Sequence, residues 1–364
     1  MKILYDYAAF LLQACGGVTR TMCEVIKREL GRADVDGRVF AGFHKNLELH
    51  QLARQFPGKI HECLLPQTVV RQRLFLPVNR AFFIPFARRF APDLCHYTFF
   101  KTPPVPKRTK VVITVHDLIG EIFDQEGNDS QAMERRSALQ KADGIICVSE
   151  NTKADLLKFY DLGTKPVLVA HHGNSLRQIS AAVPEITRPF FIYVGTRSIA
   201  YKNFDLLLKT FSNNPMLKPY GLVCFGGGAF TKAELAAIKN AGLADRVCHR
   251  QGTDAELAGY YQKATALIYP SKYEGFGLPP IEAMGFGCPV VASSAPPMPE
   301  IIGDAALFFD PGSAEQLLAA LAKLLTESGV RETLIARGRQ REQFFSWEKT
   351  SALIHDLYRS LLGN

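Results

Sequence analysis

The chain has 364 residues, of which 47% are hydrophobic and 21% are charged, a composition typical of a globular protein with about two domains. No run reaches the roughly 18 uninterrupted apolar residues that a membrane-spanning helix requires. Residues 1–6 have the pattern of a strand and lack the cationic and apolar regions of a secretory signal peptide. We therefore expect a cytoplasmic protein that does not span a membrane.

Eight cysteines are spread along the chain, and none forms a C-x-x-C pair. Several lie within apolar strand patterns, as Cys147 does in the run 145–148. This usage predicts reduced, buried cysteines and argues against a zinc site.

Strand and helix patterns alternate through the first half of the chain. The predicted strands cover residues 2–5, 39–42, 94–97, 110–115, 144–149 and 167–170. The predicted helices cover residues 19–30, 130–141 and 151–159. Periodicity fades and polar residues predominate between residues 172 and 188, where we expect the linker between two domains.

The net charge of +8 originates in one segment, Arg71–Lys110. This segment has nine basic residues and one acid, Asp93, so nine minus one equals the net charge of the whole chain. Large apolar residues alternate with the basic ones, a combination typical of segments that lie on an anionic membrane surface. An amphipathic helix packed on its own domain explains the pattern equally well. Nucleic-acid binding is less favoured, because no nucleic-acid motif accompanies the segment.

The alternation repeats in the second half of the chain. The predicted strands cover residues 190–194, 221–225, 246–249, 266–269, 289–293 and 306–309. The predicted helices cover residues 204–211, 232–241, 255–264, 278–284, 314–326 and 347–362. Alternating strands and helices with near-continuous apolar strands predict parallel sheets that are covered on both faces.

We therefore predict an α/β fold with two doubly wound, Rossmann-like domains that face each other across a cleft. The first domain would comprise residues 1–180, and the second residues 188–346. The last helix, at residues 347–364, would return to the first domain.

Three motifs in the first domain were considered as sites. Gly16 and Gly17 precede a helix, where they would open its N-terminus to an anion or a sugar, although paired glycines are also common in turns. His116 follows the most apolar strand, where a histidine can donate or accept a proton near pH 7, or can simply lie at the surface. The D-V-D sequence at 34–36 resembles a metal-binding motif, but its place before a glycine predicts a turn. We expect no metal site.

The loop 195–203 follows the first strand of the second half and contains Arg197 and Lys202. Two cations from one loop can neutralise a diphosphate without a metal, and solvated surface charge is the ordinary alternative. The three glycines 226–228 predict a flexible turn or a second point of close approach.

Glu274 and Glu282 enclose the segment that is most informative about function. Glu274 lies in the loop after a predicted strand, and Glu282 lies on the helix that follows. Gly275 and Gly277 let the backbone approach a ligand closely, and ligands of open α/β sheets bind at the carboxyl ends of strands. Carboxylates there can accept hydrogen bonds from sugar hydroxyls, while exposed N–H groups hold a phosphate. A solvated Glu274 and a Glu282 that only complements the helix dipole form the alternative.

Together with Gly17, His116 and the loop 195–203, the segments 273–285 and 289–293 resemble the nucleotide-sugar signature of retaining glycosyltransferases of the GT-B fold, family GT4. The resemblance covers essentially the whole chain and is strongest from residue 190 to residue 311. It leans toward mannosyltransferases of O-antigen and exopolysaccharide synthesis.

The resemblance implies a role for each matching residue. Glu282 would hold the ribose of the nucleotide, Glu274 the transferred sugar, and Lys202 the diphosphate. His116 would contact the sugar near the reacting carbon. Further groups would contact the donor: Gly16, Gly17, Thr196, Gly275, Phe276, Gly277 and Leu278.

One departure from the family pattern concerns Arg197. Many members place an arginine directly after the glycine that matches Gly195, where this chain has Thr196. We expect Arg197 to reach the diphosphate from the following position.

The implied reaction moves a hexose from a nucleotide-diphosphate sugar to a hydroxyl of a lipid-linked or polysaccharide acceptor, with retention at the anomeric carbon. GDP-mannose is the first candidate donor, and no cofactor, metal or protein nucleophile is implied. The segment 71–110 would bind the inner face of the cytoplasmic membrane. The alternatives are a sugar-nucleotide epimerase of the same architecture and a non-catalytic nucleotide-sugar-binding protein. A dinucleotide oxidoreductase is least favoured, because the G-x-G-x-x-G fingerprint is missing.

Overall fold

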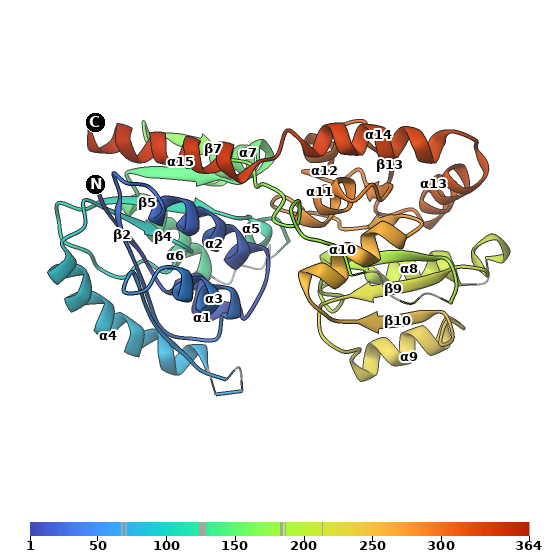
Figure 1. Cartoon of the computed structure of the whole chain (residues 1–364), viewed down its shortest axis with the longest axis horizontal. Helices are drawn as coiled ribbons and strands as arrows, with labels where there is room; N and C mark the ends of the chain where they lie inside the picture. Colours follow the sequence, from blue (N-terminus) through green and yellow to red (C-terminus); the bar gives the residue numbers. More distant parts are fainter. Residues whose placement is uncertain are drawn as a thin grey trace. The chain divides into compact units, whose positions relative to one another are not determined.

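The computed structural model describes residues 1–66, 68–69, 71–123, 129–182, 185, 187–212 and 214–363. The chain forms two compact units, one of Met1–Gly173 with Trp347–Asn364 and one of Asn174–Ser346. We call them unit 1 and unit 2 (Figure 1). The division falls at the amino end of the polar stretch 172–188.

Unit 1 is built on a parallel sheet. Within the described residues the sheet has seven strands in the order β3-β2-β1-β4-β5-β6-β7. The strands are β1 (Lys2–Tyr5), β2 (Asp36–His44), β3 (Ile60–Leu64), β4 (Leu94–Tyr97), β5 (Lys110–Val115), β6 (Gly144–Cys147) and β7 (Val167–Val169). The central strands are buried along their length, because helices cover both faces of the sheet.

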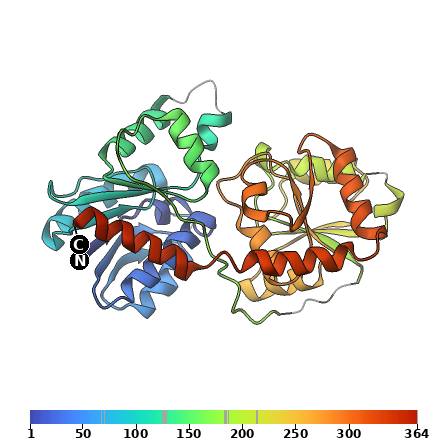
Figure 2. The same ribbon diagram turned by 90° about the horizontal axis from the view of Figure 1, so that it is seen from above.

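The helices of unit 1 connect these strands. They are α1 (Ala8–Leu12), α2 (Gly17–Leu30), α3 (Leu47–Gln55), α4 (Gln72–Phe90), α5 (Ile119–Phe123), α6 (Asp129–Lys141), α7 (Glu150–Phe159) and α15 (Trp347–Leu362). The last of them, α15, packs on α2, β6 and β7, so the end of the chain belongs to the same unit as its beginning (Figures 1 and 2).

Unit 2 repeats the plan. Its described residues form a six-stranded parallel sheet in the order β10-β9-β8-β11-β12-β13. The strands are β8 (Phe190–Val194), β9 (Gly221–Phe225), β10 (Val247–Arg250), β11 (Leu267–Tyr269), β12 (Val290–Ser293) and β13 (Ala306–Phe309). The α-helices are α8 (Phe204–Phe211), α9 (Lys232–Asn240), α10 (Asp254–Lys263), α11 (Leu278–Gly285), α12 (Met298–Ile302), α13 (Ala314–Thr326) and α14 (Val330–Glu342). Two short 3₁₀ turns, Ala200–Lys202 and Pro215–Leu217, precede α8 and β9.

Local sequence signals explain several helix starts. Ser149 caps α7 by accepting a hydrogen bond from the Thr152 backbone N–H. Thr231 and Thr253 each form a capping box with a glutamate three residues later, at the starts of α9 and α10. The predicted strand 144–149 ends earlier, at Cys147, because Ser149 is committed to this cap.

The α/β prediction is confirmed, and most predicted elements are present. Strand β3 and the short or weakly patterned helices α1, α3, α5, α12 and α14 were not predicted, and α4 was expected only as one of two alternatives. The D-V-D sequence at 34–36 is partly a strand, since β2 begins at Asp36.

The cysteine prediction was wrong for two residues. All eight cysteines are free, as predicted, and four are buried, but Cys15 and Cys63 are exposed. Cys63 lies on the edge strand β3, whose side chains alternate between covered and exposed positions. No helix in the described parts of the chain is long and apolar enough to cross a membrane.

Candidate functional site

Each sheet has a point at which the strand order reverses, and loops on the two sides of that point diverge to leave room for a ligand. In unit 2 the reversal lies between β8 and β11. The loop after β8 contains Arg197 and Lys202, and the loop after β11 contains Glu274. The fold therefore brings together residues that lie about 70 positions apart in the sequence.

Lys202 and Glu274 form an ion pair at this reversal point. The Lys202 Nζ atom lies 2.7 Å from Oε1 and 2.9 Å from Oε2 of Glu274. The two side chains are 19% and 10% exposed, so the pair is only partly shielded from solvent. Burial is the main cause that raises the pKa of Tyr269 well above its usual value, and the negative charge of Glu274 adds to it. The sequence analysis assigned these two charges to one site, but it did not predict their direct contact.

Asn203 fixes the loop that carries Lys202. It adopts a left-handed conformation with φ of 59°, which is uncommon for a residue other than glycine. Its Nδ2 atom donates to the carbonyls of Pro270 at 3.0 Å and Pro311 at 2.8 Å. The loop after β8 is thereby tied to the loop after β11. The sequence analysis gave Asn203 no role, although an asparagine just before an apolar helix is a recognisable turn signal.

The N-terminus of α11 lies directly after Glu274. Gly277 precedes the helix with φ of 94°, and a Cβ atom there would lie 2.7 Å from Cε of Met298. The positive φ favours glycine, and the backbone turns sharply into α11. Pro279 and Pro280 have no backbone N–H, so among the first three residues of the helix only Leu278 has an N–H that could point to an anion. Glu282 is 4% exposed, and its carboxylate accepts a hydrogen bond of 3.1 Å from the Tyr261 hydroxyl.

The structure gives Arg197 a different environment from the one we predicted. Its side chain is 1% exposed and pairs with Glu234 at 3.0 Å. The other two guanidinium nitrogens donate to the carbonyls of Gly226 at 2.8 Å and Gly228 at 2.6 Å, and the guanidinium lies 4.7 Å from the centre of the Phe230 ring. The guanidinium is therefore bound by the loop after β9. This geometry does not agree with the expectation that Arg197 contacts a diphosphate.

The loop that Arg197 holds is a turn of three glycines. Gly226, Gly227 and Gly228 all have φ between 70° and 77°. A Cβ atom at Gly227 would lie 2.3 Å from the Gly195 carbonyl oxygen, so this turn packs directly on the backbone before Thr196. The Thr196 carbonyl accepts a hydrogen bond of 2.7 Å from the Tyr193 hydroxyl. The turn is thus a close contact between two loops, as the second of the two predicted alternatives has it.

In unit 1, the glycine pair lies at the N-terminus of α2, as predicted. Gly16 is the N-cap residue, and its carbonyl accepts a hydrogen bond of 3.1 Å from the Thr19 hydroxyl. The Thr21 hydroxyl donates to the Gly17 carbonyl at 2.8 Å and lies 3.2 Å from Nε2 of His172.

His116 lies just after β5 and is 6% exposed. Burial lowers its pKa to about 4, so the imidazole is neutral at pH 7. Its Nε2 atom is buried and has no hydrogen-bond partner among the described residues, and its ring centre lies 6.5 Å from that of His172. A buried imidazole nitrogen without a partner is costly unless a ligand supplies one.

Asp6 was missed by the sequence analysis. It follows β1, is fully buried, and accepts hydrogen bonds of 2.7 Å from both the backbone N–H and the hydroxyl of Thr98. Burial raises its pKa to about 7, and the hydrogen bonds oppose that shift. A single aspartate after a strand carries no sequence signal that separates it from a turn residue.

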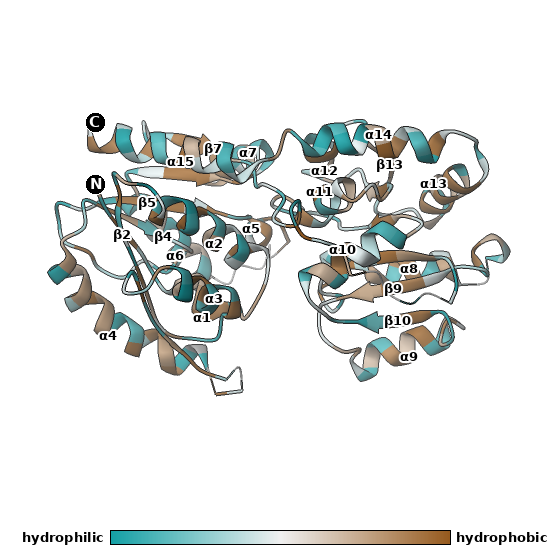
Figure 3. Ribbon diagram, viewed as in Figure 1, coloured by the Kyte–Doolittle hydropathy of each residue, from teal (hydrophilic) through white to brown (hydrophobic). Residues whose placement is uncertain are grey.

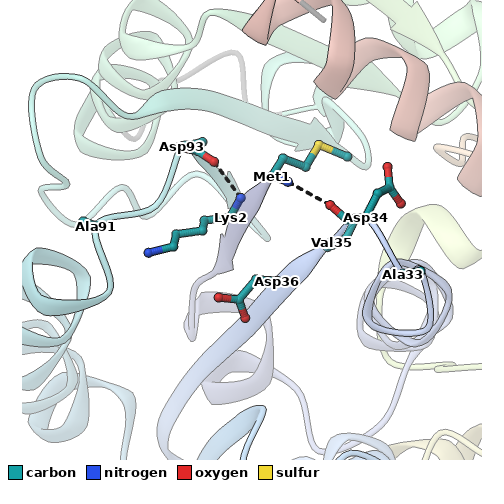
Figure 4. Close-up of a pocket in the computed structure, with 8 residues that line it drawn as sticks. All are labelled: Met1, Lys2, Ala33, Asp34, Val35, Asp36, Ala91 and Asp93. Atoms are coloured by element: carbon teal, nitrogen blue, oxygen red, sulfur yellow. Dashed lines mark hydrogen bonds between the residues drawn. The ribbon is translucent and has the colours of Figure 1, made fainter.

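A cavity lies at the opposite edge of the unit 1 sheet from Asp6 and His116. It has a volume of about 510 Å³ and is formed at the amino ends of β1 and β2, where Asp34, Asp36 and Asp93 meet Lys2 (Figure 4). The Lys2 backbone N–H donates to Asp93 at 2.7 Å, and the chain N-terminus donates to the Asp34 carbonyl at 2.8 Å. Within the described residues there is no cluster of three or more histidine, cysteine, aspartate or glutamate side chains that would hold a metal ion.

Two protein-family models match adjoining parts of the chain. The family model described as Glycosyl transferases group 1 matches residues 177–341, and the model described as Glycosyltransferase Family 4 matches residues 15–177. The O-antigen chain mannosyltransferase B of Escherichia coli is 25% identical over 372 residues, covering 95% of this chain and 96% of that protein.

Two solved structures are similar over the whole chain. Sucrose-phosphate synthase from Thermosynechococcus elongatus has a TM-score of 0.79 at 20% identity, covering 100% of this chain and 99% of that one. The Anabaena protein HepE, solved with UDP and glucose, has a TM-score of 0.77 at 17% identity, covering 99% of this chain and 100% of that one. The two family models meet at residue 177 and together extend from residue 15 to residue 341, so the chain belongs to the GT4-type glycosyltransferases of the GT-B fold.

Proposed function

We propose that the chain transfers mannose from a nucleoside-diphosphate sugar to a hydroxyl of a lipid-linked or polysaccharide acceptor, with retention of configuration. The ion pair of Lys202 with Glu274 at the strand-order reversal of unit 2 carries this proposal. It combines a cation for a diphosphate with a carboxylate for sugar hydroxyls, next to the N-terminus of α11. The mannosyltransferase name of the Escherichia coli relative supports the choice of sugar, and GDP-mannose is our first candidate.

The donor would be held mainly by unit 2. Glu282 accepts hydrogen bonds from the ribose hydroxyls, and the Tyr261 hydroxyl orients its carboxylate. Glu274 accepts from hydroxyls of the transferred sugar, and Lys202 donates to the diphosphate. Backbone groups complete the donor contacts, at Gly16, Gly17, Thr196, Gly275, Phe276, Gly277 and Leu278.

The bond-breaking step would be helped by electrostatics. Negative charge develops on the departing diphosphate, and Lys202, the Leu278 backbone N–H and the positive end of the α11 dipole would hold it. The neutral His116 offers an unpartnered Nε2 to a sugar hydroxyl. The acceptor hydroxyl attacks from the face that the diphosphate leaves, and the diphosphate takes its proton. This route needs neither a protein nucleophile nor a metal, and it differs from the two-carboxylate chemistry of glycoside hydrolysis.

The substitution Glu274→Gln tests the site. It removes the charge that positions Lys202 and replaces one of the two acceptor oxygens with an NH2 donor, and we expect transfer to fall by about 100-fold or more. Transfer is measured with a panel of nucleotide sugars, and donor binding by the rise in melting temperature that each donor causes. We expect wild type to respond to GDP-mannose, and transfer to continue after treatment with EDTA.

Glu315→Gln is the matched control, because Glu315 is exposed on α13. It should leave transfer and the melting response unchanged. Far-ultraviolet circular dichroism shows whether the Glu274→Gln variant is folded. Undiminished transfer by a folded Glu274→Gln enzyme would exclude the proposed site.

We also propose that α4 binds an anionic membrane surface. Leu74, Val78 and Phe82 are 62%, 37% and 60% exposed, and their spacing of four places them on one face of the helix. Figure 3 shows the mixture of hydrophobic and hydrophilic residues along α4. The five arginines of this region are all exposed: Arg71, Arg73, Arg80, Arg88 and Arg89. Arg80 comes two positions after Val78 and therefore lies on the other side of the helix. An exposed apolar face with flanking arginines favours a bilayer that contains anionic lipids.

Replacing Arg88 and Arg89 with glutamate tests this surface. Each basic residue contributes about 1 kcal/mol to binding an anionic surface, so we expect at least a tenfold loss of co-sedimentation with phosphatidylglycerol-containing vesicles. Replacing Arg331 and Arg337 on α14 with glutamate gives a control of equal charge change. Equal co-sedimentation of the α4 variant and wild type would rule out this surface.

A further inference from the structure

Unit 1 has its own strand-order reversal, between β1 and β4, and a second cavity lies at the carboxyl ends of these strands. The cavity has a volume of about 210 Å³. Tyr7 follows β1, Lys101 and Thr102 follow β4, and α4 and α6 supply the remaining walls. Ligands of open α/β sheets bind at such a position, and none of the roles proposed above uses this cavity.

The lining of this cavity is positively charged. Arg80 comes from α4, Lys101 from the loop after β4, and Lys141 from the end of α6. Glu134 is the one carboxylate among the described lining residues, and three cations minus one anion leave a net charge of +2. The Lys101 ammonium is hydrogen-bonded to Glu134.

The other two cations are not neutralised. Lys141 Nζ lies 3.4 Å from the Thr102 hydroxyl, a long contact with a neutral group. Within the described part of the chain, no carboxylate lies within ion-pair distance of Arg80. Two cationic groups with free donors therefore border one small cavity.

Buried contacts fix helix α4, which carries Arg80. Asn79, next to Arg80, is fully buried and exchanges two hydrogen bonds of 2.9 Å with the Phe43 backbone on β2. Tyr7 is 1% exposed and packs edge-on against Phe83 of α4, with ring centres 5.9 Å apart. Arg80 thus projects from a helix whose position is fixed by buried contacts, and the backbone of this wall needs little ordering on binding.

We propose that this cavity binds a phosphate or diphosphate group of the acceptor. Arginine and lysine are the side chains that recognise phosphate oxygens, arginine as a two-pronged donor and lysine as a point charge. A volume of about 210 Å³ is smaller than the roughly 300–1,000 Å³ of sites for drug-sized ligands, so it fits a diphosphate better than a whole nucleotide. The assignment of this phosphate to an acceptor rests on the proposed function, whereas binding of the phosphate group does not.

The test is calorimetric titration of the full-length protein with inorganic diphosphate and with geranyl diphosphate. Arg80→Gln and Lys141→Gln should each weaken binding by about tenfold, the effect of one lost hydrogen bond to a charged group. Lys202→Ala removes diphosphate binding at the donor site of unit 2 and should leave this component unchanged. Tighter binding of geranyl diphosphate identifies a lipid-linked source, and equal binding of both probes identifies the phosphate group alone.

Glu134→Gln supplies a test with the opposite sign. It frees the Lys101 ammonium and removes the one opposing charge, so diphosphate should bind several-fold more tightly. Arg136→Gln is the control, because Arg136 is exposed on the same helix and does not line the cavity. Diphosphate binding that is absent, or that Arg80→Gln, Lys141→Gln and Glu134→Gln leave unchanged, would overturn the proposal.

Failure of the proposed function is distinguishable from failure of this site. The melting response to nucleotide sugars reports the donor site and should persist in Arg80→Gln. If that response is missing from wild type while the Arg80-dependent diphosphate binding remains, the donor assignment is wrong and the phosphate site stands. In transfer assays, Arg80→Gln should raise the KM for a phosphate-bearing acceptor and leave the KM for the donor unchanged.

Discussion

The guanidinium of Arg197 joins the two loops that follow β8 and β9. Its three nitrogens contact Glu234 and the carbonyls of Gly226 and Gly228, in a site that excludes water. Glu234 in turn belongs to the capping box of α9. Arg197 therefore helps to position the loop that carries Lys202, since Gly227 packs on the backbone at Gly195.

Arg197→Ala should destabilise the protein by about 3 kcal/mol, because it leaves Glu234 and two carbonyls without their buried partner. Arg197→Lys should recover only part of the loss, because lysine lacks the planar guanidinium whose three nitrogens reach three separate acceptors. Chemical denaturation measures the change. Arg188→Ala is the control, because Arg188 is exposed and should change stability by less than about 0.5 kcal/mol. If the Arg197→Ala protein were as stable as wild type but bound the donor more weakly, Arg197 would contact the diphosphate, as the sequence predicts.

Helix α15 is attached to unit 1 by buried polar contacts. The Tyr358 hydroxyl lies 2.5 Å from Nδ1 of His96, and Nε2 of His96 lies 2.7 Å from the Thr114 hydroxyl. On the same helix, Ser351 and His355 each contact the buried carboxylate of Glu29 at 2.9 Å. These contacts link the end of the chain to α2, β4 and β5. Hydrophobic packing alone would allow α15 to slide, whereas paired polar groups specify one position.

Tyr358→Phe should lower the stability of unit 1 by about 1–3 kcal/mol, because it leaves one buried nitrogen of His96 without its partner. Hydrogen exchange of the α15 amides should become faster, and the amides of unit 2 should keep their protection. Tyr220→Phe in unit 2 is the control, since the Tyr220 side chain is only partly buried. Unchanged exchange in α15 would mean that apolar contacts alone hold this helix.

Charge is distributed unevenly over the molecule, both at the surface and in the interior. The surface excess lies in the segment Arg71–Lys110. The interior of unit 1 holds titratable groups whose pKa values burial has shifted. Burial lowers the pKa of His96 to about 3 and that of His116 to about 4, and it raises the pKa of Asp6 to about 7. Unit 1 is therefore the part of the molecule that should respond to pH.

The two histidines have folded pKa values below the usual 6.5, so the unfolded chain takes up protons first as the pH falls. Their contribution to stability is complete above about pH 6.5, and at pH 5 each has lost roughly 2 kcal/mol. Asp6 acts in the opposite direction, because its raised pKa lets the folded state gain stability as the pH falls from about 7 toward 4. His172 adds to the loss, because burial also lowers its pKa well below the usual value. The net result should be a loss of stability between pH 7.5 and pH 5.

Asp6→Asn removes the opposing contribution, so the loss of stability on acidification should become steeper. Trp347 is the single tryptophan and lies in unit 1, so its fluorescence follows the unfolding of this unit. Unfolding by urea is compared at pH 7.5 and pH 5 for wild type and the variant. If the free energy of unfolding falls by the same amount from pH 7.5 to pH 5 in both proteins, Asp6 is not protonated in the folded state near pH 7.

The sequence alone determined the fold class and pointed to the segments that carry Lys202 and Glu274. Strand and helix periodicities are local, and the glutamate segment 273–285 is a continuous motif, so both can be read without knowing contacts. The placement of Lys202 and Glu274 at one sheet edge also follows from alternating strands and helices.

Only the tertiary structure decided which polar groups meet. Arg197 and Lys202 lie in one loop and look alike in the sequence, yet one is buried against a glycine turn and the other faces Glu274. The raised pKa of Asp6 and the cationic cavity beside Arg80 depend on residues from separate elements. Burial and partner identity arise from contacts between distant segments, and a pattern along one segment does not contain them.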